Sequence, residues 1–261
     1  MATNIFKAEK DALCFLALMA KMFKNFDDQF IAPDGEKTHT KGLNIHALLI
    51  DNGTGTVLGM QQNSIHAFNN PLLHAEQLTL KEAIEKKNQI NPRDPNQTSV
   101  ESYYRNYLFN DPSTYDALNA GSTIYTTLEP CPFCTSALLV SRVKRIVYIV
   151  PDSVYGNSFF TTWIAYYKKY DIHYEQMKID FVKSDMIANA IEFLKRISEK
   201  TVTLKDIPST LYFDYLKDEL NLVSVYFNSL NEQNLITSDS ERLRNANLLQ
   251  DLRNKISMRN D

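Results

Sequence analysis

The sequence predicts an α/β fold, in which helices and strands alternate, followed by a helical C-terminal extension. Two observations predict this class. Two apolar runs flank the pair Asn52-Gly53 in the manner of a β-hairpin, and from residue 123 to residue 200 β-branched runs alternate with stretches of helical periodicity. A chain of 261 residues is long enough to bury one good core with a smaller second unit.

The composition indicates a reducing compartment and a small-molecule partner. The cysteines, Cys14, Cys131 and Cys134, are three in number and too few for a disulfide framework, so we expect a cytoplasmic protein. The formal charge is −3, with 28 Lys and Arg against 31 Asp and Glu, whereas proteins that bind nucleic acid usually carry a basic excess. Nucleic acid is therefore a partner that the charge does not favour.

The first expected element is an amphipathic helix over about residues 6–26, which contains the apolar run ALCFLALMA. This run is too short to span a bilayer. Asp11 interrupts the basic lead-in that a signal peptide would need, and no clean cleavage site follows. We expect neither a membrane span nor a signal peptide.

The middle of the chain predicts strands and helices in alternation. In the stretch NIHALLIDNGTGTVLGMQQN, Asn52-Gly53 predicts a tight turn between two antiparallel strands, because glycine tolerates the positive φ of such turns. A helix is expected to begin near His74, and the tyrosine-rich stretch at about 88–121 is interpreted as an insertion. The elements expected after it are a strand at 123–129, a helix at 135–142, a strand at 145–150, a helix at about 158–170, a strand near 172–179 and a helix near 185–200.

Beyond about residue 201 only helical patterns occur. Two helices are expected at 209–230 and 238–256, the second opened by a capping box from Ser238 to Glu241. We therefore predict a domain at 1–200, which includes the insertion, and a helical extension at 201–261. The extension is expected to cover an apolar face of its own domain, and the alternative is self-association or partner docking.

The stretch LEPCPFCTSAL places Cys131 and Cys134 where a strand passes into a helix, and it has three interpretations. A thiol–disulfide pair suits a helix N-terminus, which lowers the pKa of a thiol, but Pro130 stands where redox sites usually have an aromatic residue. A structural zinc site needs four ligands, and Cys14 lies in an apolar helix where a cysteine usually serves as a small buried hydrophobe.

The third interpretation combines the HAE motif, which begins at His74, with the later PCPFC motif. His74 opens one helix, and Cys131 and Cys134 lie on one face at the start of another, so three side chains can converge on one zinc ion. The fourth position stays open to water, whose pKa such an ion lowers to about 7. Glu76 is expected to reach this water as a proton shuttle without binding the metal.

These motifs resemble those of the cytidine deaminase-like superfamily, in the branch with tRNA adenosine, guanine and cytosine deaminases. The resemblance covers roughly residues 5–180 and rests on HAE, IYTTLEPCPFC and ALLVSRVKRIVY. It implies a three-layer α/β/α sandwich with a mixed, about five-stranded central sheet. It also implies Zn²⁺ as the cofactor, with His74, Cys131 and Cys134 as ligands and Glu76 as the proton shuttle.

The resemblance further implies contacts to a substrate. Asn63 stands eleven residues before His74, where the family carries an asparagine that hydrogen-bonds the base. Backbone groups near Ala75 are expected to meet polar atoms of the base, and Asp152 matches a frequent family aspartate near the substrate entrance. His46 replaces a residue that is usually small on the first strand near the base pocket, which leaves the identity of the base open.

The implied activity is hydrolytic removal of an exocyclic amine from a purine or pyrimidine base or nucleoside, with release of ammonia. The alternative within the class is an adenosine deaminase acting on tRNA or other RNA. Alternatives from other classes are a thiol–disulfide oxidoreductase using Cys131 and Cys134, and a catalytically idle interaction protein with the same fold. Because relatives often form dimers, we also expect a homodimer.

Overall fold

The computed structural model describes residues 2–31, 37–90, 121–141, 143–156, 172–179, 184–204, 206–235 and 239–258. Most of the predicted insertion and the helix expected at 158–170 lie outside these residues. So does Ser238, the first residue of the predicted capping box.

A mixed five-stranded sheet with the order β4-β3-β5-β6-β7 forms the centre of the molecule. β3 is antiparallel to both of its neighbours, β4 and β5, and β5, β6 and β7 run parallel to one another. This arrangement confirms the predicted sheet. The strands are β3 (His46–Asp51), β4 (Val57–Gln62), β5 (Ser122–Leu128), β6 (Arg145–Val150) and β7 (His173–Gln176).

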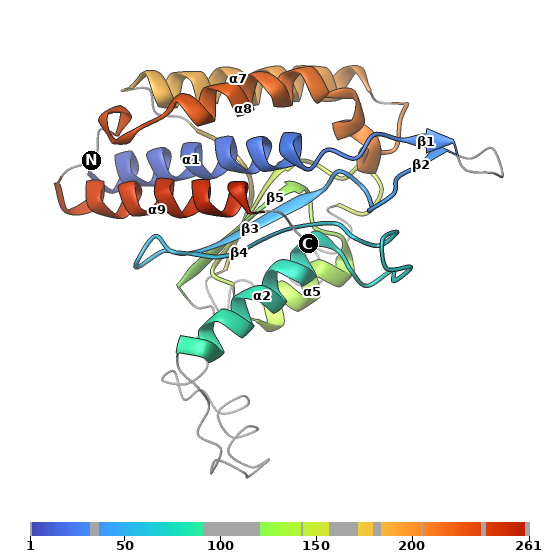
Figure 1. Cartoon of the computed structure of the whole chain (residues 1–261), viewed down its shortest axis with the longest axis horizontal. Coiled ribbons are helices and arrows are strands. Elements are labelled where there is room, and N and C mark those ends of the chain that lie inside the picture. Colours follow the sequence, from blue (N-terminus) through green and yellow to red (C-terminus); the bar gives the residue numbers. More distant parts are fainter. Residues whose placement is uncertain are drawn as a thin grey trace, which may run out of the picture.

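Helices cover both faces of the sheet, so the three-layer α/β/α fold is confirmed (Figure 1). One face carries α2 (Ala75–Ile90) and α5 (Pro132–Val140). The other carries α1 (Ala2–Lys24) and α9 (Asp239–Ser257), which lie side by side. A small antiparallel strand pair, β1 (Phe30–Ile31) and β2 (Lys37–Thr38), follows α1.

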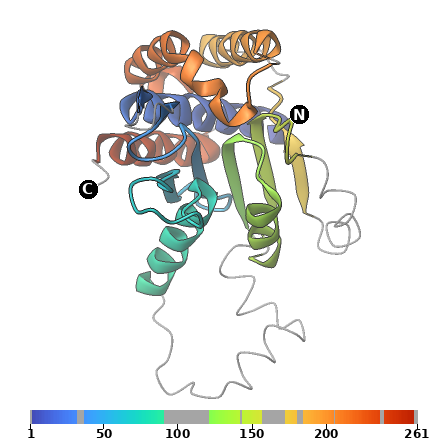
Figure 2. The same ribbon diagram turned by 90° about the vertical axis from the view of Figure 1, so that its right-hand side faces the viewer.

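The helix α1 is buried on all sides, because other helices cover the side that faces away from the sheet. Every residue from Ala12 to Ala20 is 0 % exposed. The helices α7 (Asp185–Thr203) and α8 (Lys217–Ser229) pack against α1 as a further layer (Figures 1 and 2), and Phe227 of α8 belongs to the same core. None of the helices in the described ranges is both long and apolar enough to cross a membrane.

The C-terminal part differs from the two continuous helices that were expected. The first of them is divided into a 3₁₀ helix, η1 (Ser209–Tyr215), and α8, with Leu216 between them. A further 3₁₀ turn, η2 (Glu232–Asn234), precedes α9. The two parts make different contacts. Ser209 of η1 bonds to Asp152 in the loop after β6, whereas α8 packs against α1.

A buried ion pair ties α1 to the sheet. The Asp11 carboxylate accepts hydrogen bonds from Arg145 Nη1 at 2.6 Å, Arg145 Nη2 at 2.8 Å and the Tyr125 hydroxyl at 2.6 Å. Arg145 also donates from Nε to Glu175 at 2.6 Å. One carboxylate of α1 is thus fixed to two neighbouring strands at once.

The turn between β3 and β4 differs from the one predicted. It is longer than a two-residue turn, and the Asp51 carboxylate holds it by accepting from the N–H groups of Gly53 at 2.8 Å and Thr54 at 3.0 Å. The glycine with positive φ is Gly55, at +77°, and not Gly53. The residue in the left-handed conformation is therefore two positions later than predicted, in a turn whose first part is held by the Asp51 side chain.

Candidate metal centre

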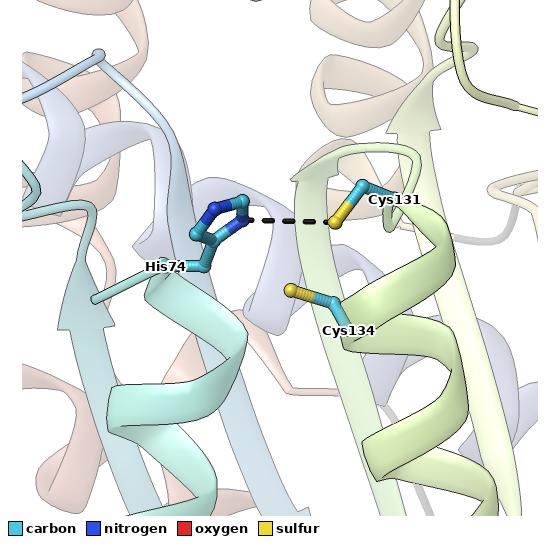
Figure 3. A group of neighbouring side chains, drawn as sticks. All are labelled: His74, Cys131 and Cys134. Carbon is cyan, nitrogen blue, oxygen red and sulfur yellow. Dashed lines mark hydrogen bonds between the residues drawn. The ribbon is translucent and has the colours of Figure 1, made fainter. Parts of the chain in front are cut away.

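His74, Cys131 and Cys134 lie together at the N-terminal ends of α2 and α5 (Figure 3). Their ligand atoms are all within 4.8 Å of one another, and Cys131 Sγ is 3.7 Å from His74 Nδ1. A tetrahedral zinc ion with Zn–S of about 2.3 Å and Zn–N of about 2.1 Å separates such a pair of ligands by about 3.6 Å. One imidazole and two thiols at this spacing fit zinc.

The local sequence explains why the two cysteines share this place. Pro132 occupies the first turn of α5, where its missing N–H removes no helical hydrogen bond. The helix therefore begins three residues earlier than expected, with Cys131 as its N-cap in an extended conformation at φ −63° and ψ 166°. Cys134 then follows on the first turn, and both thiols face His74 across the gap between α2 and α5 (Figure 3).

The electrostatics of the cluster favour a thiolate at Cys131. Hydrogen bonding from Cys134, together with that from His74, lowers the pKa of Cys131 to about 4. The same hydrogen bond raises the pKa of Cys134, and the bond to Cys131 raises the pKa of His74. The N-terminus of α5 adds a partial positive charge next to Cys131. The lowered pKa of Cys131 suits a zinc ligand, because zinc binds cysteine as the thiolate.

Glu76 lies in the first turn of α2 and is only 4 % exposed. Burial raises the pKa of its carboxyl to about 7, and hydrogen bonds from its own backbone N–H and from Cys134 partly oppose that effect. This contact places the carboxyl beside the three candidate ligands. A carboxyl that titrates near neutral pH can both accept and deliver a proton.

Asn63 follows the last residue of β4 and is 2 % exposed. Its backbone N–H donates to Ile45 O at 2.9 Å, and its side-chain Oδ1 accepts from the N–H of Ile65 at 3.3 Å. A Cβ on Gly42 would lie 2.4 Å from Asn63 Oδ1. Glycine at position 42 is therefore what lets the Asn63 amide occupy this place.

The two other predicted substrate contacts have different surroundings. Ala75 is the first residue of α2 and is fully buried next to His74. Asp152 is 5 % exposed, and its Oδ1 accepts from the N–H of Val154 at 2.9 Å, the N–H of Tyr155 at 3.2 Å and the Ser209 hydroxyl at 2.7 Å. The substrate-binding roles of Ala75 and Asp152 stay predictions.

Sequence reasoning did not single out Glu129, which supports the loop beside the cysteines. It is 2 % exposed, and its carboxylate accepts from the N–H of Asp152 at 3.1 Å and from the Tyr174 hydroxyl at 3.1 Å. A Cβ on Gly156 would lie 2.1 Å from Glu129 Oε2. The sequence feature that could have indicated Glu129 is an acidic residue at the end of an apolar strand, directly before Pro130.

His46 lies on the opposite face of the sheet from α2 and α5. Leu48 pairs with Tyr125, whose hydroxyl donates to Asp11 of α1, and His46 shares that face because it precedes Leu48 by two residues. Neither ring nitrogen has a hydrogen-bond partner within the described part of the chain, and burial lowers the pKa of His46 to about 3. The His46 side chain therefore faces α1, and its place near the base pocket stays a prediction.

Residues 31–150 match the family model described as "Cytidine and deoxycytidylate deaminase zinc-binding region". The chain is similar to the tRNA-specific adenosine deaminase of Aquifex aeolicus, with 28 % identity over 103 residues, which are 40 % of this chain and 50 % of that protein. It thus spans half the length of that relative. For the tRNA-specific adenosine deaminase of Rickettsia felis the identity is 27 % over 129 residues, which are 48 % of this chain and 71 % of that protein.

A local match is stronger, and the structural matches are weak. The tRNA-specific adenosine deaminase of Bacillus subtilis is 54 % identical over 38 residues, which are 15 % of this chain and 24 % of that protein. Among solved structures, guanine deaminase from Bacillus subtilis aligns with 20 % identity over 48 % of this chain and 64 % of that chain, at a TM-score of 0.29.

Proposed function

Because the chain belongs to the cytidine deaminase-like superfamily, we propose that it is a zinc-dependent hydrolase that removes an exocyclic amine from a purine or pyrimidine and releases ammonia. The observation that carries this proposal is the convergence of His74, Cys131 and Cys134, with ligand atoms within 4.8 Å of one another and the buried Glu76 beside them. Zinc bound by three protein ligands with one open position lowers the pKa of water to about 7.

The side chains divide the work of the proposed reaction. His74, Cys131 and Cys134 hold the ion, and Asn63 and the backbone at Ala75 hold the base. Glu76 takes a proton from the attacking water and passes it to a ring nitrogen of the base. As that proton moves, the water oxygen bonds to the amino-bearing carbon. Glu76 then transfers the remaining hydroxyl proton to the amino group, so the carbon–nitrogen bond breaks, a carbonyl forms and ammonia leaves.

The substrate that we favour is a free base or nucleoside, because the formal charge of −3 offers little attraction for a polynucleotide. A second candidate function is deamination of adenosine in RNA. It is supported by the similarity to tRNA-specific adenosine deaminases. The homodimer, the cytoplasmic location and the division into a deaminase domain at 1–200 and an extension at 201–261 stay predictions.

The proposal is tested by metal analysis and an ammonia-release screen. We expect about one zinc per chain, lost when Cys131 and Cys134 are both changed to alanine and retained in the matched control Cys14→Ala, since Cys14 is buried in α1. The zinc-loaded protein should release ammonia from at least one base, nucleoside, nucleotide or RNA. A metal-free protein that reduces disulfides would overturn the proposal, and so would a zinc protein that releases ammonia from none of these substrates.

A further inference from the structure

The 3₁₀ helix η1 lies outside the region that matches the family model, yet it is fixed to the loop that follows β6. Ser209, the first residue of η1, is 0 % exposed, and its hydroxyl donates to Asp152 Oδ1 at 2.7 Å. The N–H of Asp152 in turn donates to Glu129 Oε2 at 3.1 Å. Glu129 directly precedes the PCPFC motif, so two residues, Asp152 and Glu129, connect this end of η1 to the start of that motif.

A second contact fixes the other end of η1 to the segment that leads into β3. Asp214 Oδ1 accepts from Asn44 Nδ2 at 2.7 Å and lies 3.0 Å from His39 Nε2, and Asp214 Oδ2 accepts from Gln29 Nε2 at 2.8 Å. Asn44 directly precedes Ile45, whose carbonyl accepts from the N–H of Asn63. Asn44 and Ile45 therefore connect this end of η1 to Asn63, the proposed base-binding residue.

The two contacts place η1 at the end of the sheet that carries the candidate site. At this end β4, β5 and β6 finish and β3 begins, as their pairing directions require. Figure 2 looks onto this end, and η1 (orange) lies on the viewer's side together with the loop between β4 and α2. The segment therefore extends from the loop after β6, on the side of Cys131, to the entrance of β3, on the side of Asn63.

The composition of η1 indicates the chemistry that it offers. Its sequence, STLYFDY, contains no lysine or arginine, and its single charged residue, Asp214, is already hydrogen-bonded. Thr210 and Leu211 are half-buried and lie between the two anchored ends. Such a segment can contribute hydroxyl and apolar contacts but has no cation to bind a phosphate.

We propose that η1 forms one wall of the substrate site, held in place by Asp152 and Asp214, and that this wall faces an uncharged part of the substrate, a base or a ribose. Asp152 and Asp214 are then positioning residues that act through η1. The inference rests on the proposed deaminase function and deepens it. It assigns part of the binding of the base or ribose to the C-terminal extension.

The first test compares Ser209→Ala and Asp214→Asn with the wild type in kcat and KM for the best nucleoside in the ammonia screen and for its 5′-monophosphate. The matched control is Ser224→Ala, which removes a buried serine from α8. We expect both η1 variants to keep zinc and to raise KM for the nucleoside roughly tenfold, as loss of about one hydrogen bond of 1.4 kcal/mol implies. Because the monophosphate carries the same base and ribose, its KM should rise by a similar factor, and the control should stay within twofold of the wild type.

The second test measures amide hydrogen exchange without turnover. An excess of the deaminated product of that nucleoside should slow exchange in residues 209–216 of the wild type and leave α8 unchanged. KM values within twofold of the wild type in both Ser209→Ala and Asp214→Asn, without slowed exchange in residues 209–216, would overturn the inference, while an active wild type leaves the proposed function standing. A wild type that releases no ammonia would overturn both.

Discussion

Gly42 leaves room for the Asn63 side chain, so changing Gly42 to alanine should weaken base binding. The new Cβ would lie 2.4 Å from Asn63 Oδ1 and 2.7 Å from Asn63 O, and the first distance is roughly 1 Å short of ordinary contact. Asn63 is 2 % exposed and its N–H is bonded to Ile45 O, so the clash must shift the amide or the Gly42 segment. Loss of one well-placed hydrogen bond to the base costs about 1–3 kcal/mol, which is roughly 5- to 150-fold in KM.

The assay is steady-state ammonia release, with zinc content and thermal unfolding measured on the same samples. Gly121→Ala is the control, because a Cβ there would meet nothing within 4 Å. We expect Gly42→Ala to raise KM and keep zinc, as Asn63→Ala should also do, while the control behaves as the wild type. If Gly42→Ala and Asn63→Ala both keep KM within twofold of the wild type, the assignment of Asn63 to the base is refuted.

Three further predictions follow from the buried charges. Glu76→Gln should keep zinc and lower kcat by about 10²- to 10⁴-fold, because an amide cannot carry the proton, and full activity in the ammonia assay would contradict the proposed mechanism. Asp11→Asn should lower the free energy of unfolding in urea by about 3 kcal/mol, near the lower limit for a broken buried pair because Arg145 keeps its bond to Glu175; a loss well below 1 kcal/mol would argue against a stabilising pair. The hydrogen bond to Asp214 raises the pKa of His39 above 6.5, with further support from Asp27, and His66 stacks on its ring. The pair of His39 and Asp214 therefore stabilises the fold fully below pH 6.5 and loses that contribution as pH rises through the folded-state pKa, so the stability difference between wild type and His39→Gln should shrink as pH is raised above 6.5. A difference that stays constant with pH would contradict this assignment.

The elements that were predicted best are those with strong local signals. The strand at 145–150 has the predicted bounds, and α2 begins one residue after His74, where the helix was expected to start. Periodicity and β-branched runs act within a few neighbouring residues, so the chain alone reveals them. The start of α5 at Pro132 was equally local, and the preference of proline for the first helical turn was the overlooked signal.

Other features depended on contacts between distant segments. The apolar run in α1 predicts a helix, but its burial on all sides depends on the C-terminal helices that pack against it. The pairing of Leu48 with Tyr125 places the His46 side chain on the face that α1 covers, which its position along the strand does not reveal. Strand pairing and helix packing decide such questions, and neither can be read from a local pattern.

The sequence by itself determined which chemical groups are available: one imidazole, two thiols three positions apart and an acid two positions after the histidine. Only the tertiary structure decided that His74 and Cys131, 57 positions apart, bring Nδ1 and Sγ to within 3.7 Å of each other. It also decided that Asp152 holds Ser209 of the C-terminal extension beside that site. The physical reason is that residue type sets the chemistry of a side chain, whereas the packing of α2 and α5 on the shared sheet sets the distances between side chains.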